Sequence, residues 1–249
     1  MTEDTKKLNS VSETSRKSKP DVSIMNDYCI TEWEKKLGVI EGKEEKEEKI
    51  PPSICFSRKT GLDALKIANL LSEKTGYPVF EREIIEQMAE NGNLNKKSIT
   101  FFDEHYPGKL TDLAAFLFAE KSYVMSDYVK HLFRTVLSVA DITSSIFVGR
   151  GTHLILPVDR VLAVRLLSAK EYRCRNLAVD LNISETHAQE KLDDMDKEQM
   201  AFFKKVFHKK DAVPYEFDIC INCDYIEDPQ SIVNIVYTAF KEKFGSEIK

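Results

Sequence analysis

The sequence predicts an α/β fold in which a doubly wound, mainly parallel five-stranded sheet carries helices on both faces. From Pro51 onward, short apolar runs that are typical of buried strands alternate with amphipathic helical patterns. Strands separated by helices favour a parallel sheet, because parallel neighbours need a long crossover connection. The expected strands are residues 53–56, 77–80, 145–148, 161–166 and 217–222.

Helical patterns fill the intervals between these strands. Residues 64–71 carry apolar side chains at i, i+3, i+4 and i+7, which is one face of a helix. Asp228 followed by Pro229 is typical of a helix start, with Asp as the N-cap and Pro at the first helical position. Two longer helical stretches are expected over residues 110–141 and 182–210.

The chain divides into a tail, residues 1–50, and a domain, residues 51–249. Residues 1–26 hold few apolar side chains and are expected to be disordered, because they cannot bury enough surface to offset the entropy of ordering. Residues 28–40 are predicted to form a short amphipathic helix that includes Trp33, and a charged linker follows them. Two roles remain open for this helix: packing onto the domain, or binding a protein partner.

Composition excludes several classes of function. The 249-residue chain has a formal net charge of -5, which argues against general binding to nucleic acid or to anionic membranes. It contains no apolar run long enough to span a bilayer and no secretory signal, so a cytoplasmic protein is expected. Cys220 and Cys223 form the one CxxC motif and are expected inside a buried strand, so no metal site is predicted.

Candidate functional residues follow the expected strands. In an open parallel sheet, ligands bind in the crevice beyond the carboxyl ends of the strands. Arginine recurs there, and a guanidinium pairs bidentately with phosphate oxygens. The residues at this edge are Ser57, Arg58, Lys59, Thr60 and Gly61 after the first strand, Glu81 and Arg82 after the second, Gly149 and Arg150 after the third, and Arg173 and Arg175 after the fourth.

Two of these positions can be described further from the sequence alone. Arg150 lies between two glycines directly after a buried strand, where a packing role gives little reason for an arginine. Arg173 and Arg175 are two residues apart on a helix and therefore point in nearly opposite directions. At most one of these two can face the crevice.

Several segments resemble a known family in their order and spacing. They are "ICFSRKTGLDALKIANLLSEKTGYPVFEREIIEQMAE", "SIFVGRGTHLIL", "RLLSAKEYRCRNLA", "DMDKEQMAFFKKVF" and "YEFDICIN". Together they resemble the cytidylate kinase-like family, P-loop kinases related to the nucleoside monophosphate kinases. The resemblance covers residues 51–245 and implies the same doubly wound α/β sheet.

The resemblance implies roles for the candidate residues. It assigns the loop after the first strand to the phosphates of ATP, the residues after strands two and three to an acceptor monophosphate, and Arg173 or Arg175 to the transferring group. ATP and magnesium are implied as cofactors if the protein is active, and no resident metal is expected. The implied sets are Ser57, Arg58, Lys59, Thr60 and Gly61 for the cofactor, Glu81, Arg82, Gly149 and Arg150 for the acceptor, and Arg150, Arg173 and Arg175 for catalysis.

The loop departs from the family pattern on the donor side. The family pattern is similar to Ser-Arg-x-x-Gly-Ser-Gly-Gly-Arg, and only Ser57, Arg58 and Gly61 match it. The family also tends to carry a lid arginine shortly after an Asp-Lys pair, whereas Asp196-Lys197 is followed here by Glu and Gln. The acceptor-side Gly-Arg is retained. The loop is therefore a degenerate Walker A motif.

A capping role explains the acidic residue of this loop. "TGLD", residues 60–63, fits the capping-box pattern that precedes a helix, in which Thr60 and Asp63 satisfy the first helical N–H groups. A bound phosphate could satisfy the same donors. The hypothesis is that the helix caps itself where relatives bind phosphate.

Three functions remain open on the sequence. The first is a weakly active or non-catalytic relative, a pseudoenzyme, that binds a nucleotide or another small phosphorylated ligand near Arg150. The second is an active nucleoside monophosphate kinase that moves the ATP γ-phosphoryl group to CMP or a similar acceptor. The third is a protein-interaction scaffold, which would use residues 28–40.

Overall fold

The computed structural model describes residues 28, 29, 31, 50–90 and 126–245. The predicted N-terminal tail, including the Trp33 helix, lies outside the described residues except for three positions. The same holds for the first half of the helical stretch predicted over residues 110–141.

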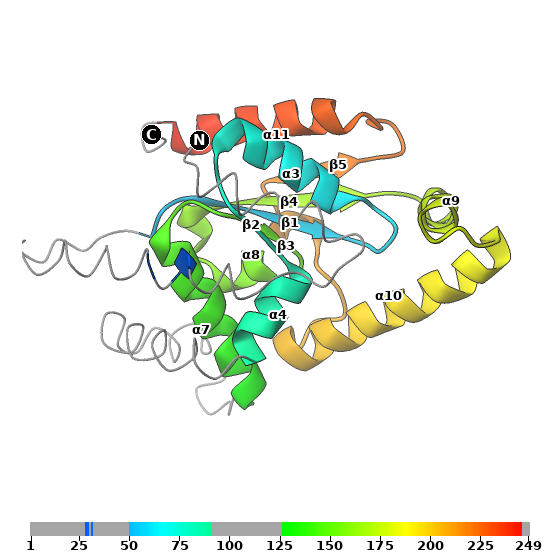
Figure 1. Cartoon of the computed structure of the whole chain (residues 1–249), viewed down its shortest axis with the longest axis horizontal. Coiled ribbons are helices and arrows are strands. Elements are labelled where there is room, and N and C mark those ends of the chain that lie inside the picture. Colours follow the sequence, from blue (N-terminus) through cyan, green and yellow to red (C-terminus); the bar gives the residue numbers. More distant parts are fainter. Residues whose placement is uncertain (1–27, 30, 32–49, 91–125, 246–249) are drawn as a thin grey trace, which may run out of the picture.

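A five-stranded parallel sheet forms the centre of the molecule (Figure 1). The strand order is β2-β3-β1-β4-β5, and each neighbouring pair is parallel. The predicted α/β fold is therefore confirmed. The strands are β1 (Ser53–Arg58), β2 (Val79–Glu81), β3 (Ile146–Val148), β4 (Val161–Leu167) and β5 (Ile219–Asn222).

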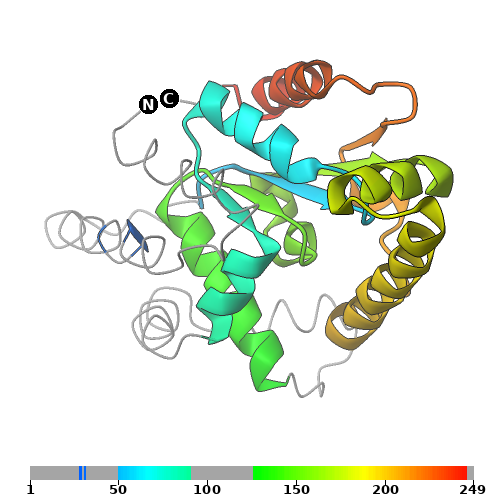
Figure 2. The same cartoon turned by 45° about the vertical axis from the view of Figure 1, so that its right-hand side comes forward.

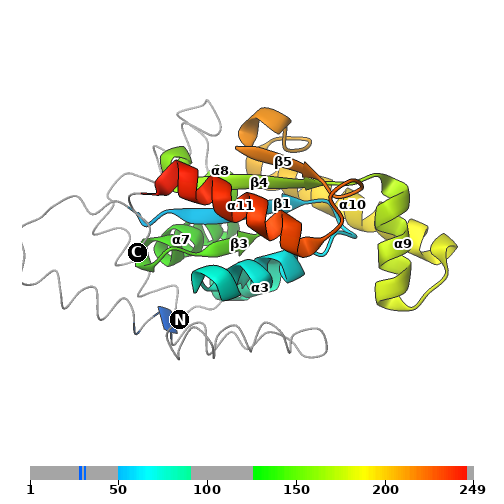
Figure 3. The same cartoon turned by 90° about the horizontal axis from the view of Figure 1, so that it is seen from above.

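Helices cover both faces of the sheet (Figure 3). One face carries α3 (Ala64–Thr75) and α11 (Pro229–Phe244), which pack on alternate strand residues such as Ile54 and Phe56. The opposite face packs residues such as Cys55 against other helices. This alternation follows from the two-residue period of a strand, and it gives the sheet two apolar layers. The helices of the second face are α4 (Arg82–Glu90), α7 (Asp127–Ile142) and α8 (Thr152–Ile155).

Two further helices lie beyond the carboxyl ends of the strands. They are α9 (Lys170–Leu181) and α10 (Glu185–Phe207), which pack against one another, and α10 runs back along the side of the sheet (Figure 2). Ser184 caps α10, because its side chain accepts a hydrogen bond from the backbone N–H of His187. The position of this pair brings α9 and α10 over the edge at which ligands bind in parallel sheets.

Most predicted elements occur close to their expected bounds, with one correction in the last strand. Asp228 caps α11 and Pro229 is its first residue, as predicted. Cys220 and Cys223 were expected inside a buried strand, but Cys220 is exposed. The reason is that β5 is an edge strand, which a short apolar run does not distinguish from a central one. In the part of the chain that the structure describes, no helix combines the length and apolar character that crossing a bilayer requires.

The loop after β3 packs closely against the end of α10, where Gly151 lies beside Phe207. Gly149, Arg150 and Gly151 have φ angles of +90°, +53° and +66°, so three consecutive residues adopt a conformation that favours glycine. A Cβ on Gly151 would lie 2.3 Å from Phe207 Cε2, whereas a Cβ on Gly149 would meet nothing closer than 4.0 Å.

This difference predicts unequal effects of alanine at the two glycines. Gly151→Ala should lower the free energy of unfolding by about 2–4 kcal/mol, because backbone strain and overpacking add. Gly149→Ala, the matched control, should cost about 1–2 kcal/mol through backbone strain alone. Urea denaturation measures both values, and an equal loss in the two variants would contradict the contact with Phe207.

Candidate functional site

The loop between β1 and α3, residues 59–63, lies at the carboxyl edge of the sheet. Asp63 is the N-cap of α3, and its Oδ1 accepts a hydrogen bond from the backbone N–H of Lys66 at 3.1 Å. The prediction that Asp63 satisfies a helix N–H group is confirmed. The prediction of Thr60 as the N-cap is wrong, because α3 begins only at Ala64.

Side chains of α9 and α10 hold this loop by its carbonyl oxygens. The carbonyl of Arg58 accepts a hydrogen bond from Gln199 Nε2 at 2.7 Å. The carbonyl of Thr60 accepts from Arg173 Nη1 at 3.1 Å, and that of Gly61 from Asn176 Nδ2 at 3.3 Å. Within the described residues, the backbone N–H groups of residues 60–62 have no acceptor. The loop therefore keeps its N–H groups available for an anion.

Gly61 allows the loop to approach α9 closely. Its φ angle is +85°, and a Cβ at this position would lie 2.6 Å from the carbonyl oxygen of Arg173. Any other residue would clash with the backbone of α9. The single glycine of the loop is thus required for the contact with the helix.

The two arginines of α9 occupy different environments. Arg173 is buried, and its Nη1 contacts both carboxylate oxygens of Asp196 on α10, at 3.1 and 3.0 Å. Arg175 is exposed and lies near Asp224. The prediction that at most one of them faces the crevice is confirmed, and the inner one binds the loop and α10.

Arg150 follows the end of β3, on the side of β1 that faces away from β4, and its side chain is enclosed. Its Nη2 forms an ion pair with Glu86 Oε1 of α4, and its guanidinium lies 4.1 Å from the ring centroid of Phe202 on α10. The side chain is 10% exposed. Burial lowers the pKa of Arg150, although Glu86 acts in the opposite direction. The guanidinium stays charged, because arginine does not lose its proton in proteins.

Arg58 and Arg82 complete a group of three arginines with Arg150, which we call the arginine cluster. The positive charge of Arg82 lowers the pKa of both other members. Burial is the main cause of the lowered pKa of Arg58, and Glu83 offsets part of it. Arg82 contacts Glu86 at 3.4 Å and Glu83 at 3.8 Å. Because β2, β3 and β1 are neighbours in the sheet, the three arginines follow adjacent strands at the same edge.

Arg58 differs from the other cations of this edge. Within the described residues its guanidinium forms no hydrogen bond and no ion pair. Its Nε is buried without a partner, as are the Nε atoms of Arg150 and Arg173, but those two arginines each pair with a carboxylate through an Nη atom. Each of the other inner cations, in contrast, contacts a carboxylate. Glu81, the last residue of β2, is buried and contributes a negative charge near Arg58.

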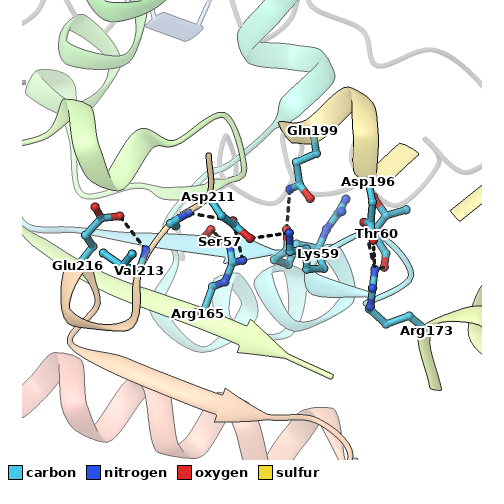
Figure 4. A network of polar contacts seen from close by, with 12 residues as sticks. Ser57, Lys59, Thr60, Arg165, Arg173, Asp196, Gln199, Asp211, Val213 and Glu216 are labelled. Atoms are coloured by element: carbon cyan, nitrogen blue, oxygen red, sulfur yellow. Dashed lines mark hydrogen bonds and ion pairs between the residues drawn. The ribbon is translucent and has the colours of Figure 1, made fainter. Parts of the chain in front are cut away.

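On the β4 side of β1, a second polar group surrounds Ser57 (Figure 4). Arg165 of β4 donates from Nη1 to Ser57 Oγ at 2.6 Å and from Nη2 to Asp211 Oδ1 at 3.3 Å. Asp211 also receives an ion pair from Lys59 Nζ at 2.6 Å. Burial alone would raise the pKa of Asp211. The hydrogen bond with Lys59, together with contacts to Ala212 and Arg165, holds this pKa below its usual range.

The segment between α10 and β5, which contains Asp211, also places Glu216 beside the buried His153. Lys209 Nζ lies 2.5 Å from Glu216 Oε1, and the backbone N–H of Val213 donates to Oε2. Burial alone would raise the pKa of Glu216, but contacts with His153 and Lys209 bring it to about 2. Burial lowers the pKa of His153, so this histidine is neutral at pH 7. These contacts fix the chain that carries Asp211 against α8.

This geometry coincides with a family match. The model of the cytidylate kinase-like family matches residues 53–225, which is more than half of the chain. The chain belongs to the cytidylate kinase-like family. The matched region contains the loop, the arginine cluster, α9 and α10.

Comparison with solved structures agrees on the fold. An uncharacterized protein from Eubacterium ventriosum has a similar structure, with a TM-score of 0.59 and 17% sequence identity over 77% of this chain and 98% of that chain. At this identity the likeness shows the fold alone. No curated protein matches the chain.

The departures from the cytidylate kinase-like pattern have structural roles in this chain. Leu62 and Ala64, two residues that replace Ser and Gly of the pattern, are buried in the core layer formed with α3 and α11. Asp63 caps α3. Leu62, Asp63 and Ala64 therefore stabilise the loop and its helix.

Sequence reasoning missed the partners of the cations. They are Glu86, Asp196, Gln199, Phe202 and Asp211. These residues lie on helices or in a loop whose placement over the edge is a tertiary feature. Arg165 was also missed, although a lone charge in the apolar run "VLAVRLL" is a signal that sequence alone provides.

Two variants of Asp63 distinguish its role as the N-cap of α3 from the effect of its negative charge. Asp63→Ala should lower the free energy of unfolding by about 1 kcal/mol, because the N–H of Lys66 loses its acceptor. Asp63→Asn should change stability little, since Asn is an equally good N-cap. Thermal or urea unfolding measures this difference, and equal stability of the alanine and asparagine variants would contradict the capping role.

Proposed function

We propose that this chain binds the phosphate of a nucleoside monophosphate, or of a similar small phosphorylated ligand, at the arginine cluster Arg58, Arg82 and Arg150. The observation that carries the proposal is the guanidinium of Arg58, which has no partner within the described residues. Like charges gathered at one edge repel one another, and a phosphate would relieve this repulsion.

The geometry of the cluster supports recognition of a phosphate. A guanidinium offers five N–H groups, and Arg150 uses one nitrogen for Glu86. Phe202 stacks on Arg150 and limits its movement. The carboxylates Glu83 and Glu86 keep the cluster electrically balanced, and we expect the ligand to compete with them for Arg82 and Arg150.

The donor side supports weak or absent phosphoryl transfer. Phosphoryl transfer depends on positioned cations around the transferring group. Lys59 and Arg173, two candidates for this task, each contact a carboxylate of the chain. Asp63 places a further carboxylate at the N-terminus of α3, where a phosphate would bind in relatives. The preferred function is therefore ligand binding with little or no kinase activity.

A second candidate is an active nucleoside monophosphate kinase that uses Mg·ATP. The backbone N–H groups of residues 60–62 favour it, because within the described residues they have no acceptor. Consecutive N–H groups of this kind can bind the phosphates of a nucleotide. The two candidates differ in whether Mg·ATP binds.

Calorimetric titration with CMP tests the proposal. Arg58→Ala and Arg150→Ala should each weaken CMP binding by about tenfold or more, because each removes a charged hydrogen bond to phosphate. Arg175→Ala is the matched control, since Arg175 is exposed and lies near Asp224 rather than in the cluster. Its affinity should equal that of the unaltered protein.

Two results would contradict the proposed binding function. Equal CMP affinity in the Arg58, Arg150 and Arg175 variants would exclude the arginine cluster as the phosphate site. Turnover of CMP with Mg·ATP at a rate typical of kinases, about 1–100 per second, would favour the second candidate.

A further inference from the structure

We propose that Lys59, Arg165 and Ser57 form a second anion site that can hold a phosphoryl group, and that the carboxylate of Asp211 fills this site in the present conformation. The proposal goes beyond ligand binding at the arginine cluster and does not depend on it. It rests on the contacts of Asp211, on the burial of Arg165 and on the position of both beside β1.

Asp211 is bound in the way that an anionic ligand would be bound. One carboxylate oxygen lies 2.6 Å from Lys59 Nζ, and the other accepts from Arg165 Nη2 at 3.3 Å and from the backbone N–H of Ala212 at 2.8 Å. Ser57 Oγ, bonded to Arg165 at 2.6 Å, adds a hydroxyl to the same group (Figure 4). Two cations and a hydroxyl are donors that suit a phosphoryl group.

Arg165 and Asp211, the cation and the anion of this group, differ in exposure. The side chain of Arg165 is 6% exposed, and Arg165 is the only charged residue of β4. A buried guanidinium is destabilising unless an anion accompanies it. The side chain of Asp211, in contrast, is 45% exposed. The cation is therefore fixed in the interior, while its anion lies at the surface and can turn into solvent.

The position of the group separates it from the arginine cluster. Arg165 lies directly opposite Ser57 in the β1–β4 register, whereas Arg82 and Arg150 follow β2 and β3 on the other side of β1. The two cationic groups thus lie on either side of the carboxyl end of β1. Between them lies the β1–α3 loop, in which the N–H groups of residues 60–62 have no acceptor within the described residues.

Asp211→Asn tests whether the carboxylate occupies a usable site. The asparagine keeps the size of the side chain and removes its charge. Calorimetric titration with inorganic pyrophosphate should then show affinity about tenfold or more above that of the unaltered protein, because a competing charge beside two cations is gone. Adding Lys59→Ala to Asp211→Asn should abolish the gain.

Asp193→Asn provides a matched control. Asp193 forms an ion pair with Lys170 at 2.5 Å and is 42% exposed, so it resembles Asp211 in exposure and pairing but lies on α10 away from Lys59. This control should bind pyrophosphate as weakly as the unaltered protein. Equal affinity in the Asp211 and Asp193 variants would overturn the proposal.

The experiment also covers loss of stability and the source of the phosphoryl group. If Asp211→Asn unfolds because Arg165 loses its anion, millimolar pyrophosphate should restore its folding, and failure to do so would contradict the proposal.

Equal affinity for pyrophosphate and Mg·ATP would support a site for free polyphosphate, whereas tighter binding of Mg·ATP would support a nucleotide phosphate. CMP affinity should stay unchanged in these variants, which separates this test from that of the arginine cluster.

Discussion

The carboxyl edge of this protein depends on the hydrogen bonds from α9 and α10 to the carbonyl oxygens of the β1–α3 loop. Gln199, Arg173 and Asn176 each bind one carbonyl, and Gly61 allows the close approach that these bonds require. A phosphate-binding loop with several glycines can close around its ligand, because glycine permits positive φ angles. This loop has one glycine and is fixed from its carbonyl side instead. Arg173 is consequently a positioning residue in this conformation.

The second constraint is the pairing of buried charges. Removing an ion from water is costly, so a buried cation is tolerated only with an anion nearby. Asp196, Asp211 and Glu86 supply this anion to Arg173, Arg165 and Arg150. These pairs stabilise the edge when no phosphate is bound, and they also compete with any phosphate that enters. A ligand therefore gains only the difference between its own contacts and those that it replaces.

The sequence predicts the sheet well and the site in part. Alternating apolar runs and helical stripes are local signals, and a parallel sheet brings residues such as Arg58, Arg82 and Arg150 to one edge. The charge pairs were not predicted, because Asp196 and Asp211 lie 23 and 46 residues from Arg173 and Arg165 and approach them only through the path of α10. The cap at Asp63 was predicted from its pattern, but Thr60, the first residue of the predicted capping box, is not the N-cap of α3.

A crystal structure of the protein with CMP would show whether a phosphate binds between Arg58 and Arg150, as we propose. We expect the phosphate oxygens within hydrogen-bond distance, about 2.7–3.2 Å, of the Arg58 guanidinium and of a nitrogen of Arg150. A CMP phosphate bound to residues 60–62 without either arginine would contradict the proposed site, as would a CMP-saturated crystal with the Arg58 guanidinium still free of any ligand.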